Sequence, residues 1–458
     1  MASIIKRKNK YSVVYYYKDE EGEKQQKWET CQTLGEAKKR KAEVELQQSE
    51  GSFIPPSEVT VRDLLSDFVK LYGTEKWALS TFESNCSLIE NYINPIIGDV
   101  RIQQIGPKFV DQYYKTLKKT KSVVVNKRKP RSEYVSAGVI NSIHKLLRCA
   151  FNQAVKWEMI SKNPFPSATK PKNTYKKRDI WTAETIQIAL TKCTDMKLYI
   201  AMNLAFACSM RSGEISGLPW DKVFISDADI AKDNAHLVIE QELARVSRQA
   251  RAQLEDKDII YVFPSLMPNS HTNLVLKTPK TESSIRTVWI PKTLAYILRE
   301  WKKMQEEFKD FLGEDYHDYN LVLTFPNGRP VENRIIEKDF GRLKEEAGLP
   351  DVVFHSLRHS STTYKLKLNH GDLKATQGDT GHAEINMITD VYAHILDEDR
   401  KINAQKFEAA FYAKHDLRKV SPPKEENPDI ENIITALQKS PELIQMLSNL
   451  LNKQVISS

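Results

Sequence analysis

The hydrophobic periodicity of this 458-residue sequence changes several times, and proline-containing linkers separate the blocks. Residues 1–50 show strand-like runs, residues 57–172 carry apolar side chains at helical spacing, and strand-like runs return between residues 236 and 290. A chain of this length is expected to form roughly two to four domains. We therefore predict a multidomain, mainly α fold with small β-sheets, divided into residues 1–50, 57–172, 179–415 and 416–458.

The first block predicts a small β-sheet followed by one helix. Tyr11–Tyr17 is rich in β-branched and aromatic residues, Asp19–Gly22 indicates a turn, and Lys24–Thr33 predicts a return strand. A basic helix is expected from Gly35 to about Gln48. A linker that ends in two prolines then separates this unit from the second block.

The second block predicts an all-helical domain. Thr60 and Asp63 stand at capping-box spacing, and the apolar residues after them repeat at helical period. A second helix is expected to start near Ser80 and to stop at Pro95. Two further helices are predicted at residues 107–118 and 136–156. The basic residues 164–177 are expected to tether this domain to the third block.

A strongly basic stretch, residues 115–131, lies between the last two of these helices. Its positive charges repel one another unless phosphates neutralise them, and each neutralised phosphate steepens the salt dependence of binding. We therefore predict that this stretch contacts DNA, with a solvated loop as the alternative. The residues predicted to bind are Lys119, Lys121, Lys127, Arg128, Lys129 and Arg131.

The third block combines helices with a strand-rich segment. A helix is expected after Thr182, and a longer one from Lys197 to Met210 leads to Arg211. Four strand-like runs follow between residues 236 and 290. Helices are predicted again at residues 291–308 and 334–346.

Reactive side chains are concentrated between His355 and Tyr392, with Arg358 and His382 between them. Arginine stays protonated at working pH, and its planar fork can donate two parallel hydrogen bonds to a phosphate. A tyrosine that attacks phosphorus forms a covalent phosphotyrosine, so the energy of the broken bond is kept and strands can be rejoined without ATP. Each of these residues alone is more often a surface or core residue, but their combination predicts phosphodiester chemistry.

The order His-x-x-Arg-His, Gly-His and a tyrosine ten residues later resembles the second conserved box of the tyrosine recombinase (phage integrase) family. Ala207–Leu218, followed by Pro-Trp-Asp, resembles the first box, with Arg211 as its arginine and Glu214 as the acidic residue that usually follows. Lys277–Arg286 resembles the β-hairpin lysine motif of the family. These motifs extend over some 180 residues, which makes the resemblance specific.

The resemblance implies six catalytic residues: Arg211, Lys280, His355, Arg358, His382 and Tyr392. The two arginines would grip the nonbridging oxygens of the scissile phosphate, and Tyr392 would form a 3′-phosphotyrosyl bond. Lys280 would protonate the departing 5′ oxygen, His355 would help to accept the tyrosine proton, and His382 would hydrogen-bond the phosphate. Glu214 would orient its neighbours. No carboxylate cluster with metal-ligand spacing stands nearby, so we expect no metal and no cofactor.

Two of these assignments have rivals. Lys277 competes with Lys280, although its place before the Thr-Pro pair fits the motif less well. Tyr364 and Tyr412 compete with Tyr392, but neither follows a Gly-His pair at the spacing of the family.

The sequence also departs from the family at three places. Ser209 stands where a glycine often precedes the first arginine motif, and Thr380 replaces the usual leucine before the Gly-His pair. Neither departure removes a reacting group. The strand-rich segment is longer than the three-stranded sheet of the family, and residues 245–269 look like an insertion of unknown role.

By the same resemblance, the first block corresponds to the arm-binding domain of bivalent integrases and the second to the core-binding domain that clamps the duplex. The first sheet is expected to enter the major groove, with a charged sheet cap as the alternative. Its predicted DNA-binding residues are Lys6, Arg7, Lys8 and Lys10.

The segment after the nucleophile also has a counterpart in the family, where it commonly docks on a neighbouring protomer. For the amphipathic residues 400–412 this implies a homo-tetramer on DNA, with packing in cis as the alternative. The tail at 416–458 predicts a linker and two short apolar-striped helices that need a partner to be stable.

Composition sets milder limits. The sequence has 68 Lys and Arg against 60 Asp and Glu, a net charge of +8 that permits a polyanionic partner without proving one. The five scattered cysteines predict reduced thiols and no zinc site. No apolar run approaches the roughly 20 residues that span a bilayer. We therefore expect a soluble, cytoplasmic protein that does not bind membranes.

The leading hypothesis is a site-specific DNA recombinase that integrates and excises a phage or conjugative transposon. An excisionase or a DNA-bending host protein is expected as a further partner. A type IB topoisomerase-like enzyme is disfavoured, because that activity does not call for an arm domain. A catalytically silent DNA-binding regulator would be expected to lack an arginine, the lysine or the tyrosine, and this chain retains them all.

Overall fold

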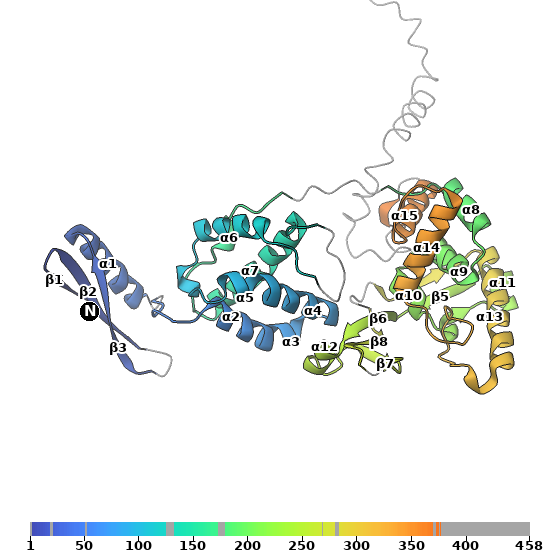
Figure 1. Cartoon of the computed structure of the whole chain (residues 1–458), viewed down its shortest axis with the longest axis horizontal. Coiled ribbons are helices and arrows are strands. Elements are labelled where there is room, and N and C mark those ends of the chain that lie inside the picture. Colours follow the sequence, from blue (N-terminus) through green and yellow to red (C-terminus); the bar gives the residue numbers. More distant parts are fainter. Residues whose placement is uncertain are drawn as a thin grey trace, which may run out of the picture. The chain divides into compact units, whose positions relative to one another are not determined.

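The computed structural model describes residues 2–18, 22–50, 53–124, 132–172, 179–267, 269–279, 284–369, 372–374 and 376 (Figure 1). Lys280, His382 and Tyr392 therefore lie outside the described residues, as do Lys127, Arg128, Lys129 and Arg131. The predictions for Thr380, for Tyr412 and for the segments at 400–412 and 416–458 also fall outside them.

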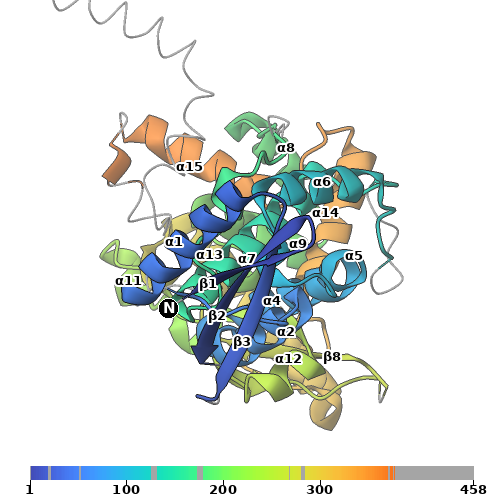
Figure 2. The same ribbon diagram turned by 90° about the vertical axis from the view of Figure 1, so that its left-hand side faces the viewer.

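The amino-terminal block is a three-stranded antiparallel sheet with one helix against it (Figures 1 and 2). Its elements are β1 (Ser3–Arg7), β2 (Lys10–Lys18), β3 (Lys24–Cys31) and α1 (Leu34–Ser49), in the sheet order β1-β2-β3. Thr33 and Glu36 form a capping box that starts α1, and Val13 and Tyr15 pack against Ala37 of the helix. The return strand and the helix agree with the sequence predictions. The strand β1 was missed, and it contains Lys6 and Arg7.

The second block is helical. Its elements are α2 (Val61–Asp67), the π-helical η1 (Phe68–Gly73), α3 (Thr74–Lys76), α4 (Leu79–Leu88), the π-helical η2 (Ile89–Ile93), α5 (Asn94–Ile97), the 3₁₀ turn η3 (Ile102–Gln104), α6 (Pro107–Lys119), α7 (Ala137–Lys156) and the 3₁₀ turn η4 (Phe165–Ser167). The predicted capping box of Thr60 and Asp63 starts α2, and Ser136 caps α7.

Two predictions for this block were wrong. Pro95 does not stop the second helix, because the chain continues through η2 and places Pro95 in the first turn of α5, where a proline needs no hydrogen bond from its nitrogen. Phe165 is fully buried in the helical core, so residues 164–168 belong to this core and not to a tether. The basic stretch also begins inside α6, which extends to Lys119.

The third block holds the remaining elements: α8 (Ala183–Lys192), α9 (Met196–Ala207), α10 (Ser212–Gly217), the 3₁₀ turn η5 (Trp220–Lys222), β4 (Val223–Phe224), α11 (Asp227–Ala231), β5 (His236–Ile239), β6 (Glu242–Ser247), α12 (Arg248–Gln253), β7 (Ile259–Val262), β8 (Thr272–Lys277), β9 (Arg286–Trp289), α13 (Lys292–Leu312), η7 (Gly313–Asp315), α14 (Asn333–Ala347) and α15 (Ser356–Leu368). Thr182 caps α8 as predicted, whereas α9 ends at Ala207, before Met210.

The strands of this block form two separate antiparallel sheets, in the orders β4-β5-β9 and β6-β8-β7. The expected hairpin around Lys280 is therefore not formed by β8 and β9, since β8 pairs with β6 and β7 while β9 pairs with β5. The surplus at 245–269 supplies half of β6 and all of α12 and β7. Its Val246, Ala250 and Leu254 share a hydrophobic cluster with buried residues of the helical block.

Close backbone packing joins α10 to β6. A Cβ atom added to Gly217 would lie 2.6 Å from the Leu243 backbone nitrogen and 2.8 Å from the Glu242 carbonyl carbon. Only glycine allows this approach without a shift of one element. The short helix that follows Arg211 is thus held at a fixed distance from the second sheet.

We predict that Gly217→Ala lowers the free energy of unfolding by about 1–3 kcal/mol, because the new methyl group meets backbone atoms that cannot turn away. Gly341→Ala is the matched control, since a Cβ there meets nothing within 4 Å and the residue lies within α14. This control should stabilise the protein by about 0.5–1 kcal/mol. Urea titration followed by tryptophan fluorescence measures both changes, and equal effects would contradict the packing argument.

Candidate functional site

Arg211 is held at the start of α10 by the acidic residue three positions later. Its backbone N–H donates to Glu214 Oε2 at 2.9 Å, and its Nη1 donates to Glu214 Oε1 at 2.7 Å. The Arg211 side chain keeps 34% of its surface exposed, whereas the Glu214 side chain keeps 1%. The guanidinium of Arg211 is therefore oriented by a buried carboxylate and remains accessible to a ligand.

A second arginine, Arg286 of β9, shares the same carboxylate. Its Nη2 donates to Glu214 Oε2 at 2.9 Å and its Nη1 to Oε1 at 3.3 Å. Burial alone would raise the pKa of Glu214, but the charge and hydrogen bonds of Arg286, with those of Arg211, hold that pKa below its ordinary value. Glu214 thus remains ionised although it is almost fully removed from water.

Ser284 adds a third connection to this group. Arg211 Nη1 donates to the Ser284 hydroxyl at 3.3 Å, and Arg286 Nη1 donates to the Ser284 carbonyl at 3.0 Å. Ser284 is itself buried and directly follows the residues around Lys280 that lie outside the described part. The described end of the lysine motif is therefore fastened to Arg211 and to its carboxylate partner.

Arg358 lies one turn into α15 and is 2% exposed. Its Nη1 donates to the carbonyl of Ser209, two residues before Arg211. Burial, followed by repulsion from Arg211 and Arg286, lowers the pKa of Arg358 to about 9, and the Glu214 charge only partly offsets this. At neutral pH Arg358 still carries its charge, in a place where positive charge is unfavourable.

Ser209 makes the contact with α15 possible. Its φ is +52°, in the left-handed region that favours glycine, and its side chain is fully buried. The Ser209 hydroxyl lies 2.6 Å from the hydroxyl of Ser361, one turn after Arg358 on α15. The glycine that the family often places here is thus explained by the backbone conformation, and the serine adds a buried hydrogen bond.

His355 stands at the start of α15, three residues before Arg358, and is exposed. Its ring packs edge-on against His359, with centroids 4.9 Å apart. Residues three apart on a helix lie on the same face, so His355 and Arg358 share one side of α15. The structure thereby brings Arg358 close to Arg211 and Glu214, and it places His355 at the start of the helix that carries Arg358.

The rival lysine has a different environment. Lys277 ends β8, is buried, and forms an ion pair with Glu242 directly opposite on β6. Tyr364, the rival tyrosine in α15, packs against Phe206 of α9. Both side chains have structural contacts that account for them.

The charges of this group do not cancel. Arg211, Arg286 and Arg358 supply three positive charges, and Glu214 supplies one negative charge among the described residues that surround them. The arrangement suits an anionic ligand that can accept hydrogen bonds from guanidinium groups, such as a phosphodiester. Within the described part of the chain, no cluster of His, Cys, Asp or Glu could hold a metal ion.

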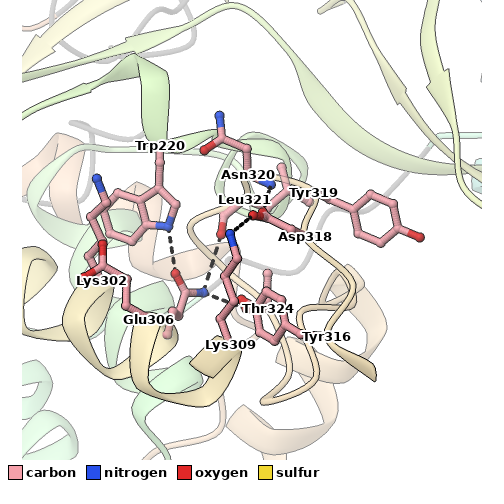
Figure 3. Close-up of a pocket in the computed structure, with 11 residues that line it drawn as sticks. Trp220, Lys302, Glu306, Lys309, Tyr316, Asp318, Tyr319, Asn320, Leu321 and Thr324 are labelled. Carbon is pink, nitrogen blue, oxygen red and sulfur yellow. Dashed lines mark hydrogen bonds and ion pairs between the residues drawn. The ribbon is translucent and has the colours of Figure 1, made fainter. Parts of the chain in front are cut away.

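A hydrogen-bonded network around a cavity of about 210 Å³ supports the segment that follows α10 (Figure 3). Trp220 Nε1 donates to Gln305 Oε1 at 2.7 Å, and Gln305 Nε2 donates to Thr324 Oγ1 at 2.6 Å. Lys309 and Asp318 form an ion pair at 2.6 Å across the same cavity. These polar groups bond one another, so we interpret the cavity as structural. Its hydrogen bonds connect Trp220, just after the first box, to α13 and to Thr324.

The comparisons with known proteins agree with this geometry. Residues 182–399 match the phage integrase family. A tyrosine recombinase XerC-like protein of Caldanaerobacter subterraneus subsp. tengcongensis is 25% identical over 397 residues, which cover 84% of this chain and 92% of that protein. This chain is a tyrosine recombinase of the integrase type.

Two further proteins that are similar to this chain are integrases. The ICEBs1 integrase of Bacillus subtilis is 25% identical over 272 residues, which cover 59% of this chain and 65% of that protein. The solved structure of the Tn1549 transposon integrase with transposon right end DNA has a TM-score of 0.57 at 17% identity, covering 76% of this chain and 99% of that chain. At this identity the structural likeness shows the fold alone.

The amino-terminal residues predicted to bind DNA lie on different sides of the first sheet of the recombinase. The register pairs Arg7 with Lys10 and Lys6 with Tyr11, so that Lys6 points to the side of α1 and Arg7 to the opposite face. Lys8 lies in the turn between β1 and β2, with a φ of +49°.

The face opposite α1 carries aromatic residues that sequence analysis did not single out. The Arg7 guanidinium lies 4.5 Å from the centre of the Trp28 ring, and the Lys24 ammonium lies 4.5 Å from that of Tyr16. Alternation along β2 and β3 was the signal that could have identified them. Lys119 and Lys121 are exposed at the end of α6 and just beyond it.

We predict that Ser209→Gly is more stable than Ser209→Ala by about 1 kcal/mol, because both lose the hydroxyl but only alanine keeps an unfavourable left-handed backbone. The matched pair at the partner residue, Ser361→Gly and Ser361→Ala, should show the opposite order by about 1 kcal/mol, since Ser361 is helical. Thermal unfolding of the four variants tests this. The same order at both positions would contradict the backbone explanation.

None of the described helices combines the length and the apolar character that crossing a bilayer requires.

Proposed function

We propose that this recombinase cuts and rejoins DNA through a 3′-phosphotyrosine at Tyr392, and thereby integrates and excises a mobile element. The observation that carries the proposal is the cluster of Arg211, Arg286 and Arg358 near the buried carboxylate of Glu214, in which Arg211 remains partly exposed. A net positive group of this kind needs an anion, and a scissile phosphate supplies one. The names of two relatives, an integrase of ICEBs1 and an integrase of transposon Tn1549, favour a mobile element as the substrate.

The roles of the residues follow from their chemistry. Arg211 and Arg358 stabilise the charge that builds on the nonbridging oxygens as the Tyr392 oxygen attacks phosphorus. The 5′ oxygen leaves and takes a proton from Lys280, while His355 helps to accept the tyrosine proton. His382 donates a hydrogen bond to the phosphate. Lys280 is preferred over Lys277, because Lys277 is buried in its ion pair with Glu242.

The two arginines differ in how a phosphate can reach them. Arg211 already presents a third of its side-chain surface, whereas Arg358 is almost completely covered. A phosphate therefore meets Arg211 first, and contact with Arg358 requires that side chain to become exposed when DNA binds. Burial, followed by repulsion from Arg211, lowers the pKa of Arg358, so exposure and contact with an anion both stabilise its charged form.

The first sheet is proposed to bind arm-site DNA through the face opposite α1. Arg7 and Lys10 lie on that face with Trp28 and Tyr16, which are 39% and 48% exposed. A basic and aromatic sheet surface can enter the major groove. Lys6 lies on the other side of the sheet and is therefore not part of this proposed interface. Lys8 lies in the turn at the border of the face.

The helical residues 57–172 are proposed to bind the core site, with Lys119, Lys121 and the basic residues 127–131 on the phosphates. Residues 179–415 would form the catalytic domain. A homo-tetramer on double-stranded DNA, an excisionase or DNA-bending partner, and action in the cytoplasm complete the proposal.

The first test traps the covalent intermediate. The full chain is incubated in EDTA with a pool of partly randomised, nicked duplexes, in which the nick lets a short strand diffuse away after cleavage. We predict a protein–DNA adduct on denaturing gels for the wild type and for Tyr364→Phe, and none for Tyr392→Phe. Sequencing of the trapped DNA recovers the core site. An adduct with Tyr392→Phe would show that another residue is the nucleophile.

The second test concerns the arm interface. We predict that Arg7→Ala weakens arm-site binding. It should also reduce the slope of log K against log salt concentration by about 1, the value expected for one lost phosphate contact. Lys6→Ala removes the same charge from the adjacent residue on the opposite face, and it should have a clearly smaller effect. Fluorescence anisotropy over a series of salt concentrations measures both. Equal effects would mean that the sheet binds DNA by another surface, or only through its net charge.

A further inference from the structure

Arg286 is a charged residue at a buried position of a strand. Along β9 the side chains alternate between buried and exposed, and Arg286 occupies an inward position, with 6% of its side chain exposed. Buried ion pairs contribute little to stability, because the loss of hydration offsets the attraction between the charges. Its Nε is also a buried donor without a partner among the described residues, which adds a further cost. Stability alone therefore does not account for Arg286.

The position of β9 does not depend on this side chain. The register pairs Arg286 with Ile239 of β5, and Val288, two residues later, is fully buried in the main hydrophobic cluster. The backbone of the strand is thus fixed by its ladder and by apolar packing. What the Arg286 side chain adds is its hydrogen bonds, two to Glu214 and one to the Ser284 carbonyl.

We propose that Arg286 is a positioning residue that neutralises Glu214 and so leaves the charge of Arg211 available to the scissile phosphate. The inference rests on the proposed function, since it concerns how Arg211 meets the substrate. Glu214 has two opposing effects on Arg211. Its oxygens orient Arg211 by accepting from Nη1 at 2.7 Å and from the backbone N–H at 2.9 Å. Its negative charge, however, offsets the positive charge that would attract the phosphate.

Arg286 resolves this conflict by its geometry. Its two terminal nitrogens reach both oxygens of the carboxylate, so that Arg286 and Glu214 together form a neutral unit. Arg211 can then remain hydrogen-bonded to Glu214 while its charge is directed to the ligand. Ser284 supports the same arrangement, because its hydroxyl accepts from Arg211 and its carbonyl accepts from Arg286. Without Arg286, Arg211 becomes the principal counter-ion of a buried carboxylate.

The test uses nicked duplexes that carry the core sequence recovered from trapped adducts, with either a normal phosphodiester or a neutral methylphosphonate at the scissile position. We predict that Arg286→Met slows adduct formation on the phosphodiester by about 10- to 100-fold. On the methylphosphonate, which has one charged oxygen fewer, the loss should shrink to a few-fold. Arg286→Lys keeps the charge but not the two-pronged contact, and it should lie between wild type and Arg286→Met.

A double variant separates charge compensation from a merely structural role. If Arg286 serves to neutralise Glu214, then Arg286→Met combined with Glu214→Gln should form adducts faster than Arg286→Met alone, because the uncompensated carboxylate is gone. A structural role predicts that the second substitution adds to the damage. The double variant also removes the buried carboxylate that Arg286→Met leaves with Arg211 as its principal counter-ion, so it should be at least as stable as Arg286→Met. Arg299→Met, which breaks an exposed ion pair with Asp227 on the same domain, is the control and should behave as wild type.

Failure of this inference is distinguishable from failure of the proposed function. A variant is said to recover if its loss of adduct formation is smaller on the methylphosphonate than on the phosphodiester. Arg211→Ala should recover in this sense if Arg211 binds the scissile phosphate. Recovery of Arg211→Ala without recovery of Arg286→Met would overturn the role of Arg286 and keep that of Arg211. Recovery of neither would overturn both. Recovery of Arg286→Met only on a substrate with a 5′-bridging sulfur, whose leaving group needs no proton, would show that Arg286 acts on the leaving-group step and would also overturn the inference.

Discussion

The Glu214 carboxylate is the constraint on which the candidate site depends. An isolated carboxylate with 1% of its surface exposed would be neutral, because burial disfavours the charged form. Two arginines reverse this preference and hold the pKa of Glu214 below its ordinary value. A buried anion then fixes the direction of both guanidinium groups. The positive charge of the site is thereby set in place before any DNA is bound.

The surrounding fold serves to hold α10, the short helix that carries this carboxylate. Gly217 lets the backbone of β6 approach the helix, and the segment after it pairs with residues 320–322 through Trp220 and Val322. Gln305 then connects Trp220 with the same stretch of chain. The helix is short, so its position cannot come from its own stability and has to come from such contacts. The contacts that position α10 therefore also position Arg211, which directly precedes the helix.

Local signals in the sequence predicted local structure well. The capping box at Thr60 and Asp63 and the cap at Thr182 depend on neighbouring residues alone, and both are found where they were expected. Pro95 was misjudged, because the sequence does not show that a π-helical turn precedes it and moves it into a first turn. The division of the strands into two sheets depends on contacts between distant residues, which periodicity does not report.

The site itself was predictable in part for the same reason. Arg211, Glu214 and Arg358 stand in recognisable motifs. Ser284 and Arg286 lie at the end of the Lys277–Arg286 motif, in which only the lysine was predicted to have a role. One signal in the sequence did mark Arg286: a charge at the inward position of an alternating strand requires a buried partner. Glu214 could not be named as that partner from the sequence, because 72 residues separate the two. The net charge of +8 did not predict the site either. The charge available to a ligand depends on which arginines are already neutralised by the buried carboxylate.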